Sequence, residues 1–181
     1  MRKETFRMIL GYVIGGSVFL LLIPRGLFLA SRAFDPVVGI FLIPLPWLRL
    51  AVAIVSLLIG LAFAFWSGVI QNEIGKGGPL EVAGIEVSPK TQNLVVCGPY
   101  RFTRNPMLFG TCVFYFAVAV YLNSIVALGI VILFMAFMLL LVKLTEEPRL
   151  LREFGDEYAQ YRRSTSMFVP WPHKGGAGDG A

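Results

Sequence analysis

The sequence predicts an all-α polytopic integral membrane protein, with four transmembrane helices, a cytoplasmic polar rim and a C-terminal amphipathic helix. Of the 181 residues, 56% are hydrophobic, and the mean hydropathy is +0.72, whereas about half of an ordinary soluble domain is apolar. The apolar residues also form long blocks, and a helix needs about 20 of them to cross a ~30 Å hydrocarbon core. The length suits one domain, which we expect at residues 1–170, followed by a disordered tail at 171–181.

The first apolar block, Met8 to Ile23, is long enough to span only if its helix continues to Ala33. Basic residues precede the block and small residues follow near Ser31, so the segment also resembles a secretory signal peptide. We favour an uncleaved first span.

Three later blocks complete the predicted bundle. Trp47 to Ile70 and Ile125 to Val142 are long enough outright, and Met107 to Leu122 is long enough if its ends reach the membrane interface. Between the first two spans, Val37 to Leu45 is apolar but short and contains two prolines. We interpret it as a re-entrant or interfacial segment, and a fifth span stays open.

The distribution of basic residues predicts the orientation, because loops rich in lysine and arginine stay in the cytoplasm. With four spans and the N-terminus inside, 13 of the 16 basic residues are cytoplasmic, and only Arg25, Arg32 and Arg49 lie on the other side. Both termini are then cytoplasmic, in the cell inner membrane of a bacterium or the endoplasmic reticulum of a eukaryote. The charge suits anionic lipid headgroups, and no nucleic-acid partner is expected.

The turn between the third and fourth spans consists only of Asn123 and Ser124. Such a tight hairpin brings its far ends together, so "TRNP" before the third span lies level with "LTEEPR" after the fourth. The second span ends on the same side with "NEIGKGGP". The long linker from Gln71 to Pro106 is therefore predicted to be an ordered active-site loop rather than a tether.

After the fourth span, Pro148 predicts a bend, because proline disfavours helix at the residue before it but suits a first helical turn. Leu151, Phe154, Tyr158 and Tyr161 then follow a 3, 4, 3 spacing, which is typical of one helix face. The opposite face is charged, so this helix is predicted to lie on the membrane or over the rim.

Two adjacent carboxylates, Glu146 and Glu147, lie at a helix C-terminus. The helix dipole and their mutual repulsion both disfavour the charges there, unless nearby cations compensate them. Arg101 and Arg104 supply that charge across the hairpin, although membrane anchoring also explains them. Together, these acids and bases suit a zwitterionic ligand. The cysteines, Cys97 and Cys112, show no metal-ligand spacing, so we interpret them as small buried residues and expect no metal.

From Trp66 to Pro170, over half the chain, the residues resemble the isoprenylcysteine carboxyl methyltransferase and phospholipid methyltransferase superfamily of membrane enzymes. The resemblance rests on "GPYRFTRNPMLFG", including Gly110, and on "EEPRLLREFGDEYAQYRRSTSMFVP" after the next span. It implies S-adenosylmethionine as methyl donor, a catalytic core at residues 66–170, and a cofactor pocket lined by the Arg104-Asn105-Pro106 element, Gly110 and the glutamate pair. Asn105 and Leu108 stand where relatives often carry histidine and tyrosine.

This resemblance, with the charges of the methyl donor, gives the expected site residues. Arg104, with Arg101, would bind the cofactor carboxylate, and Glu146 and Glu147 the ammonium or ribose hydroxyls. Glu147 would also be the nearest base for an amine acceptor, so Arg104 and Glu147 are the expected catalytic residues. The pocket wall and its cytoplasmic side would be formed by Gly75, Gly77, Gly98, Pro99 and Tyr100.

The expected acceptor is a lipid or lipidated molecule that arrives from the bilayer, such as an isoprenylcysteine carboxylate or a phospholipid amine. Small apolar alcohols or thiols stay open. Two other functions are alternatives: a membrane reductase that uses NADPH, similar to the sterol reductases, and a non-enzymatic membrane scaffold.

Overall fold

The computed structural model describes residues 15–75, 81–82, 85–86 and 93–171, and these confirm the all-α prediction. Apart from the helices, the described residues form one short antiparallel hairpin of two-residue strands, in which Glu81 pairs with Glu86 and Val82 with Ile85. In chain order, the elements are η1 (Val18–Leu22), α2 (Ile23–Val38), α3 (Pro46–Glu73), β1 (Glu81–Val82), β2 (Ile85–Glu86), η2 (Gly98–Arg101), α4 (Pro106–Leu122), α5 (Ile125–Leu141), η3 (Val142–Glu146) and α6 (Glu147–Ser164).

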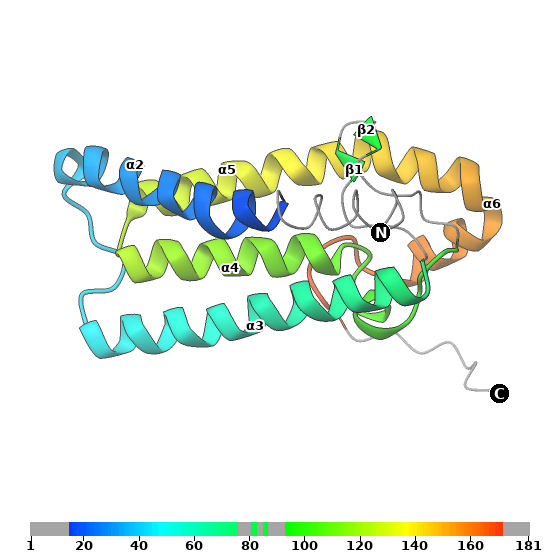
Figure 1. The fold of residues 1–181 in the computed structure, drawn as a ribbon, viewed down its shortest axis with the longest axis horizontal. Coiled ribbons are helices and arrows are strands. Elements are labelled where there is room, and N and C mark those ends of the chain that lie inside the picture. Colours follow the sequence, from blue (N-terminus) through cyan, green and yellow to red (C-terminus); the bar gives the residue numbers. More distant parts are fainter. Residues whose placement is uncertain (1–14, 76–80, 83–84, 87–92, 172–181) are drawn as a thin grey trace, which may run out of the picture.

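The helices α2, α3, α4 and α5 lie side by side in an elongated bundle (Figure 1). α4 packs against α3 on one side and α5 on the other, and α2 packs against α5 and α4. The loop between α2 and α3 and the α4–α5 turn lie at one end of the bundle, while η2 and α6 lie at the opposite end.

Three helical stretches of the described chain are long and apolar enough to cross a membrane: Gly15–Val38, Pro46–Glu73 and the continuous stretch Ile125–Ser164. α4, the predicted third span, is apolar but has 17 residues, at the lower limit for a spanning helix. The predicted extra segment from Val37 to Leu45 forms no helix beyond Val38. Four crossings and the cytoplasmic termini stay predictions. Of the predicted disordered tail at 171–181, Trp171 is ordered, because its nitrogen donates to the Phe102 carbonyl at 3.0 Å, and residues 172–181 lie outside the described residues.

α3 and α4 approach each other at two glycines. A Cβ atom added to Gly60 would lie 2.6 Å from the Phe114 nitrogen, and one added to Gly110 would lie 2.6 Å from the Ala64 nitrogen. Only glycine permits this distance between backbones, as is common where membrane helices pack. The buried cluster beside this contact is formed by Leu27, Tyr115, Ala119, Ala127 and Val131.

The first helix passes through Pro24 because it contains a π-helical turn, η1. The nitrogen of Ile23 donates to the Val18 carbonyl, five residues back, and Pro24 has no N–H. The Phe19 carbonyl therefore receives no hydrogen bond from the nitrogen of Ile23 or Pro24. It accepts one from the Tyr115 hydroxyl at 3.1 Å instead. This contact supplies the partner that a buried tyrosine hydroxyl needs.

The predicted tight turn between α4 and α5 is confirmed. Asn123 has a φ of 55°, a left-handed conformation that asparagine tolerates. Ser124 caps α5 by accepting a hydrogen bond from the Ala127 nitrogen at 2.8 Å. Asp35 of α2 accepts a second bond from this helix start, from the Val126 nitrogen at 3.2 Å. The helix dipole favours such a carboxylate.

The predicted bend at Pro148 is wrong in position. The helix continues from α5 into α6 through a second π-helical turn, η3, and Pro148 lies in the first turn of α6. The backbone leaves helical geometry at Gly155, with a φ of 53° and a ψ of −126°. This break interrupts the predicted apolar face: Leu151 is 42% exposed, whereas Tyr158, beyond the break, is buried.

The two cysteines are both free thiols, but only Cys112 is buried as predicted. Cys97 is exposed at the start of η2, where the chain turns toward α4.

Candidate active site

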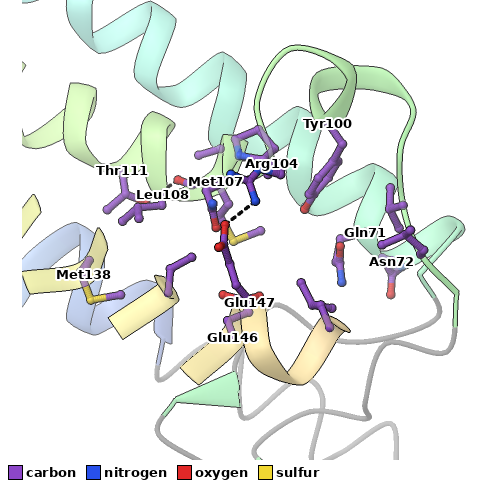
Figure 2. A pocket seen from close by; sticks show the side chains of 18 of the residues that line it. Gln71, Asn72, Tyr100, Arg104, Met107, Leu108, Thr111, Met138, Glu146 and Glu147 are labelled. Atoms are coloured by element: carbon purple, nitrogen blue, oxygen red, sulfur yellow. Dashed lines mark hydrogen bonds and ion pairs between the residues drawn. The ribbon is translucent and has the colours of Figure 1, made fainter. Parts of the chain in front are cut away.

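A cavity of about 780 Å³ opens between α3, α4, α5 and α6 at the α6 end of the bundle. Arg104, Glu146, Glu147 and Tyr100 line it together with apolar side chains (Figure 2). In this view, Gln71 and Asn72 lie on one side of the Arg104–Glu147 pair, while Leu108, Thr111 and Met138 lie on the other. The cavity therefore has a polar end and an apolar end.

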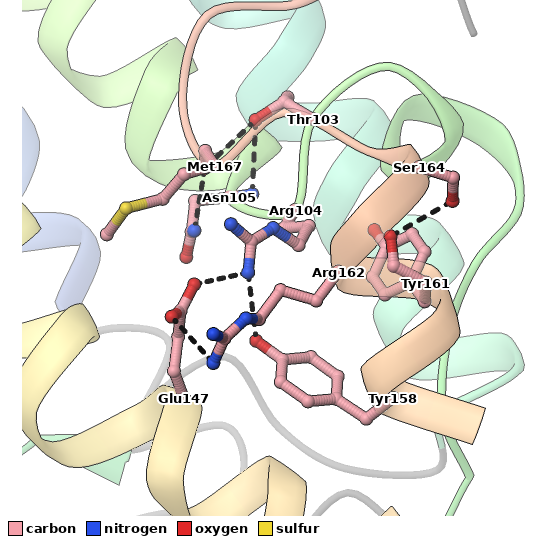
Figure 3. Close-up of polar contacts among 9 residues, drawn as sticks. All are labelled: Thr103, Arg104, Asn105, Glu147, Tyr158, Tyr161, Arg162, Ser164 and Met167. Atoms are coloured by element: carbon pink, nitrogen blue, oxygen red, sulfur yellow. Dashed lines mark hydrogen bonds and ion pairs between the residues drawn. The ribbon is translucent and has the colours of Figure 1, made fainter. Parts of the chain in front are cut away.

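Arg104 and Glu147 form an ion pair where these two ends meet, through Nη1 and Oε1. The side chains are 10% and 9% exposed, so water screens the pair little. The other carboxylate oxygen of Glu147, Oε2, lies 3.7 Å from Nη1 of Arg162. Arg104 Nη1 also donates to the Tyr158 hydroxyl at 3.4 Å (Figure 3). Two guanidinium groups thus compensate the negative charge of Glu147.

The π-helical turn η3 sets the register that brings Glu147 to Arg104. The nitrogen of Glu147 donates to the Val142 carbonyl, five residues back, so the turn holds one residue more than an α-helical turn. Each residue advances a helix by about 100°, so the extra residue rotates everything after it by that angle. Turns of this kind are frequent at functional sites.

The segment Thr165–Trp171, here called the C-terminal strap, holds the loop that carries Arg104. The Arg104 nitrogen donates to the Ser166 carbonyl at 2.8 Å. The Met167 carbonyl accepts from Thr103 Oγ1 at 3.3 Å and from Asn105 Nδ2 at 2.8 Å. The side-chain NH₂ of Asn105 is therefore directed at the strap (Figure 3).

Three tyrosines surround the polar end. The Tyr161 hydroxyl donates to the Tyr100 carbonyl at 2.6 Å, which ties α6 to η2. Burial, and then the charge of Glu146, raise the pKa of Tyr100 above its ordinary value. The Tyr100 hydroxyl therefore stays protonated at neutral pH and can donate a hydrogen bond.

One strong donor at this site has no partner among the described residues. Arg104 Nε is buried and makes no hydrogen bond, although Arg104 lines the cavity. An unsatisfied donor on a charged, buried group is costly, so natural structures rarely leave one unexplained. A ligand with an acidic or carbonyl oxygen in the cavity would satisfy it.

Six of the twelve sequence-predicted site residues line this cavity, and five others lie elsewhere in the described structure. The lining ones are Tyr100, Arg104, Asn105, Pro106, Glu146 and Glu147. Those that do not line it are Gly75, Gly98, Pro99, Arg101 and Gly110. Gly77 lies outside the described residues.

Each residue away from the cavity has a local structural role. Gly98 has a φ of 59°, and a Cβ there would lie 3.1 Å from the Ile70 side chain. The Arg101 guanidinium lies over the Phe102 ring, 5.7 Å from its centroid. Gly110 faces the α3 backbone. Pro99 is fully buried, and Gly75 follows the end of α3.

Sequence reasoning missed several lining residues. Gln71 and Asn72 extend the polar end along α3. The sequence pattern that could have indicated them is a pair of amide side chains at the end of a long apolar helix. Tyr158 and Tyr161 were assigned only to a helix face, whereas they contact Arg104 and Tyr100. No sequence signal separates Gly68, which lines the cavity, from the packing glycines.

Apolar helices long enough to cross a membrane, together with a buried charged pair inside a largely apolar cavity, are typical of a membrane protein with a small-molecule site. Residues 48–157, more than half of the sequence, match the phospholipid methyltransferase family. The chain belongs to this family. The matched range includes Arg104, Glu146 and Glu147 but ends before Tyr158 and the C-terminal strap.

Among curated proteins, the chain is similar to a methanethiol S-methyltransferase from Mycobacterium tuberculosis (strain ATCC 25618 / H37Rv). The two are 35% identical over an alignment of 80 residues, which covers 41% of this chain and 30% of that protein. The chain thus matches less than a third of the relative's length.

Proposed function

We propose that this protein is an S-adenosylmethionine-dependent methyltransferase that acts on a lipid or lipidated acceptor in the membrane. The observation that carries the proposal is the Arg104–Glu147 pair at the junction of a polar and an apolar space, in a member of the phospholipid methyltransferase family. The polar end suits the charged cofactor, and the apolar end suits the acceptor.

The residues present fit this cofactor in charge and size. Arg104 Nε is a buried donor without a partner, which suits the cofactor carboxylate. Glu147 is compensated by Arg104 and Arg162, so we assign it the role of positioning Arg104. Glu146 at the cavity wall is then the better carboxylate for an ammonium or ribose hydroxyl. The volume of about 780 Å³ lies within the ~300–1,000 Å³ common for small-molecule sites.

The chain would accelerate the reaction mainly by binding, orientation and exclusion of water. When bound, S-adenosylmethionine supplies a sulfonium methyl group, which an acceptor's lone pair takes as the carbon–sulfur bond breaks and leaves its electrons on sulfur. An ionised carboxylate or thiolate needs no base, whereas an ammonium must first lose a proton. Glu146 is the candidate to take that proton, since Glu147 is held by two arginines.

Calorimetry on the purified full-length protein in detergent tests the cofactor. S-adenosylhomocysteine should bind, and Arg104→Ala should weaken binding by about 30-fold or more, as expected when one partner of a buried charge pair is removed. Arg101→Ala is the matched control, because Arg101 is exposed and lies outside the cavity. No binding by the parent protein would refute the proposal, and NADPH binding in its place would favour a reductase.

The acceptor is tested by incubating membranes that contain the protein with a labelled methyl donor and identifying the labelled product. Label in extracted lipids, absent with Arg104→Ala, is the expected result. The M. tuberculosis relative is named for transfer to methanethiol, so a small thiol is the second candidate. Label only in a small volatile thioether would favour that candidate and contradict the lipid acceptor.

A further inference from the structure

The cavity runs along the helix axes from an apolar region to the polar end. Its lining residues recur every three or four positions, so each set lies on one face of its helix. On α3 they are Ala64, Phe65, Gly68, Val69, Gln71 and Asn72, and on α5 and η3 they are Phe134, Met138, Val142 and Glu146. Glu146 lies 12 positions after Phe134, which corresponds to about 18 Å of helix.

The inner part of the cavity, here called the apolar arm, is lined by Phe19, Ala64, Phe65, Leu108, Thr111, Phe134 and Met138. None of these side chains ionises, and the Thr111 hydroxyl donates to the Met107 carbonyl of its own helix at 2.9 Å. Phe65 is 76% exposed, so the arm borders the outer face of α3. In a membrane this face contacts acyl chains, and a hydrocarbon chain can reach the arm without crossing water.

Gly68 lies on α3 between the apolar arm and the amides of Gln71 and Asn72. A Cβ atom added there would have the Met107 methyl carbon as its nearest neighbour, at 3.9 Å, an ordinary contact with a flexible side chain. Close packing therefore does not explain this glycine, unlike Gly60 and Gly110, whose Cβ atoms would meet backbone at 2.6 Å. Glycine inside a helix costs about 0.5–1 kcal/mol relative to alanine, and here it leaves open space in the cavity.

We propose that Gly68 is a specificity-determining residue, which keeps open the passage between the polar end and the apolar arm. The acceptor is then an amphiphile: its hydrocarbon chain lies in the apolar arm, and its reacting group lies beside Gly68 and Met107, facing the cofactor at Arg104. This inference rests on the proposed function, and it narrows the substrate class to chain-bearing acceptors over small thiols.

Gly68→Leu fills the passage, and Gly129→Leu is the matched control. Gly129 is also a helical glycine with nothing within 4 Å of an added Cβ, but it is exposed on α5 and does not line the cavity. Both variants should keep their thermal midpoints and bind S-adenosylhomocysteine as the parent does. Methyl transfer is then measured to phosphatidylethanolamine, S-farnesylcysteine, dodecanethiol and methanethiol.

Gly68→Leu should lower transfer to the chain-bearing acceptor by about 10- to 200-fold, the range for a misfit of an aliphatic group in a pocket. Gly129→Leu should leave the rate unchanged. Equal rates for Gly68→Leu and the parent would overturn the inference, and so would a parent that methylates only methanethiol. Neither result would contradict the proposed cofactor site. A parent that does not bind S-adenosylhomocysteine refutes the proposed function itself.

A chemical test of the passage does not depend on finding the acceptor. With Cys97 and Cys112 replaced by serine, Gly68→Cys and Gly129→Cys are treated in membranes with dodecyl methanethiosulfonate or with its charged trimethylammonium-ethyl analogue. The passage joins both ends, so Gly68→Cys should react with both reagents, whereas the exposed position on α5 should react only with the alkyl one. If Gly68→Cys resists either reagent, the passage is closed and the inference is wrong.

Discussion

At the scale of single residues, the site depends on Glu147, whose two carboxylate oxygens face two different arginines. One oxygen pairs with Arg104 and the other faces Arg162, so this carboxylate neutralises two cations within a largely buried space. Glu146, its neighbour, also lines the cavity, and its side chain is more open to solvent: it is 44% exposed, and its Oε1 lies 4.0 Å from Nη2 of Arg149. Two adjacent glutamates therefore have different surroundings.

Glu147→Gln tests whether the Glu147 carboxylate compensates both arginines. A glutamine oxygen can still accept from Arg104, but the NH₂ group then faces Arg162 as a second donor. The free energy of unfolding should fall by about 1–3 kcal/mol, the range for leaving a buried polar group unsatisfied. S-adenosylhomocysteine affinity, measured well below the thermal midpoint, should fall as well because Arg104 loses its fixed orientation.

Glu157→Gln is the control for this change, since Glu157 is an exposed residue of the same helix, and an exposed substitution alters stability by about 0.5 kcal/mol or less. Thermal unfolding and calorimetry measure both quantities. An unaltered affinity in a destabilised Glu147→Gln protein would mean that Glu147 only supports the fold.

At the scale of elements, the C-terminal strap makes Arg104 part of a structure rather than of a free loop. Thr103 and Ser166 form a bridge in parallel register, and the Trp171 nitrogen donates to the Phe102 carbonyl at 3.0 Å. Thr103 is fully buried, and its hydroxyl both donates to Met167 and accepts from the Asn105 nitrogen at 3.2 Å. One hydroxyl thus joins the loop to the strap.

Thr103→Val keeps the shape of this side chain and removes both hydrogen bonds. We expect a loss of about 1–3 kcal/mol in the free energy of unfolding, because two buried polar groups lose a partner, together with weaker binding of S-adenosylhomocysteine. Thr103→Ser restores the hydroxyl and should restore affinity. Thr145→Val removes an exposed hydroxyl bonded within its own helix and should leave affinity unchanged. If serine fails to rescue binding, the hydroxyl is not what positions Arg104.

Some features of the elements were predictable from the sequence, and others were not. The α4–α5 turn followed from two residues between apolar blocks, and that turn brings Arg104 and the glutamate pair to one end of the bundle. The break at Gly155 was missed, because a glycine with positive φ looks like any other glycine in a helical pattern. The strap was missed because Asn105 and Met167 are 62 residues apart, and nothing in their spacing indicates the contact.

At the scale of the whole molecule, the cavity exists because α3, α4 and α5 stay in fixed relation. Gly110 was predicted to contact the cofactor, but it acts where α3 and α4 pack: its added Cβ would also lie 2.7 Å from the Gly60 carbonyl oxygen. The cavity lies beside this contact, with Ala64 and Gly68 on α3 and Met107 and Thr111 on α4. The spacing of these two helices therefore sets the width of the site.

Gly110→Ala should act on the site through this spacing. The added methyl group meets backbone atoms that cannot move alone, so α3 and α4 must separate, at a cost of about 1–3 kcal/mol typical of overpacking. S-adenosylhomocysteine affinity should fall too, although Gly110 does not line the cavity. Gly129→Ala, on an open helix surface, should leave stability unchanged or raise it by up to about 1 kcal/mol. Thermal unfolding and calorimetry on the two variants decide the matter: a Gly110→Ala protein as stable and as tight-binding as Gly129→Ala would mean that the α3–α4 contact does not control the site.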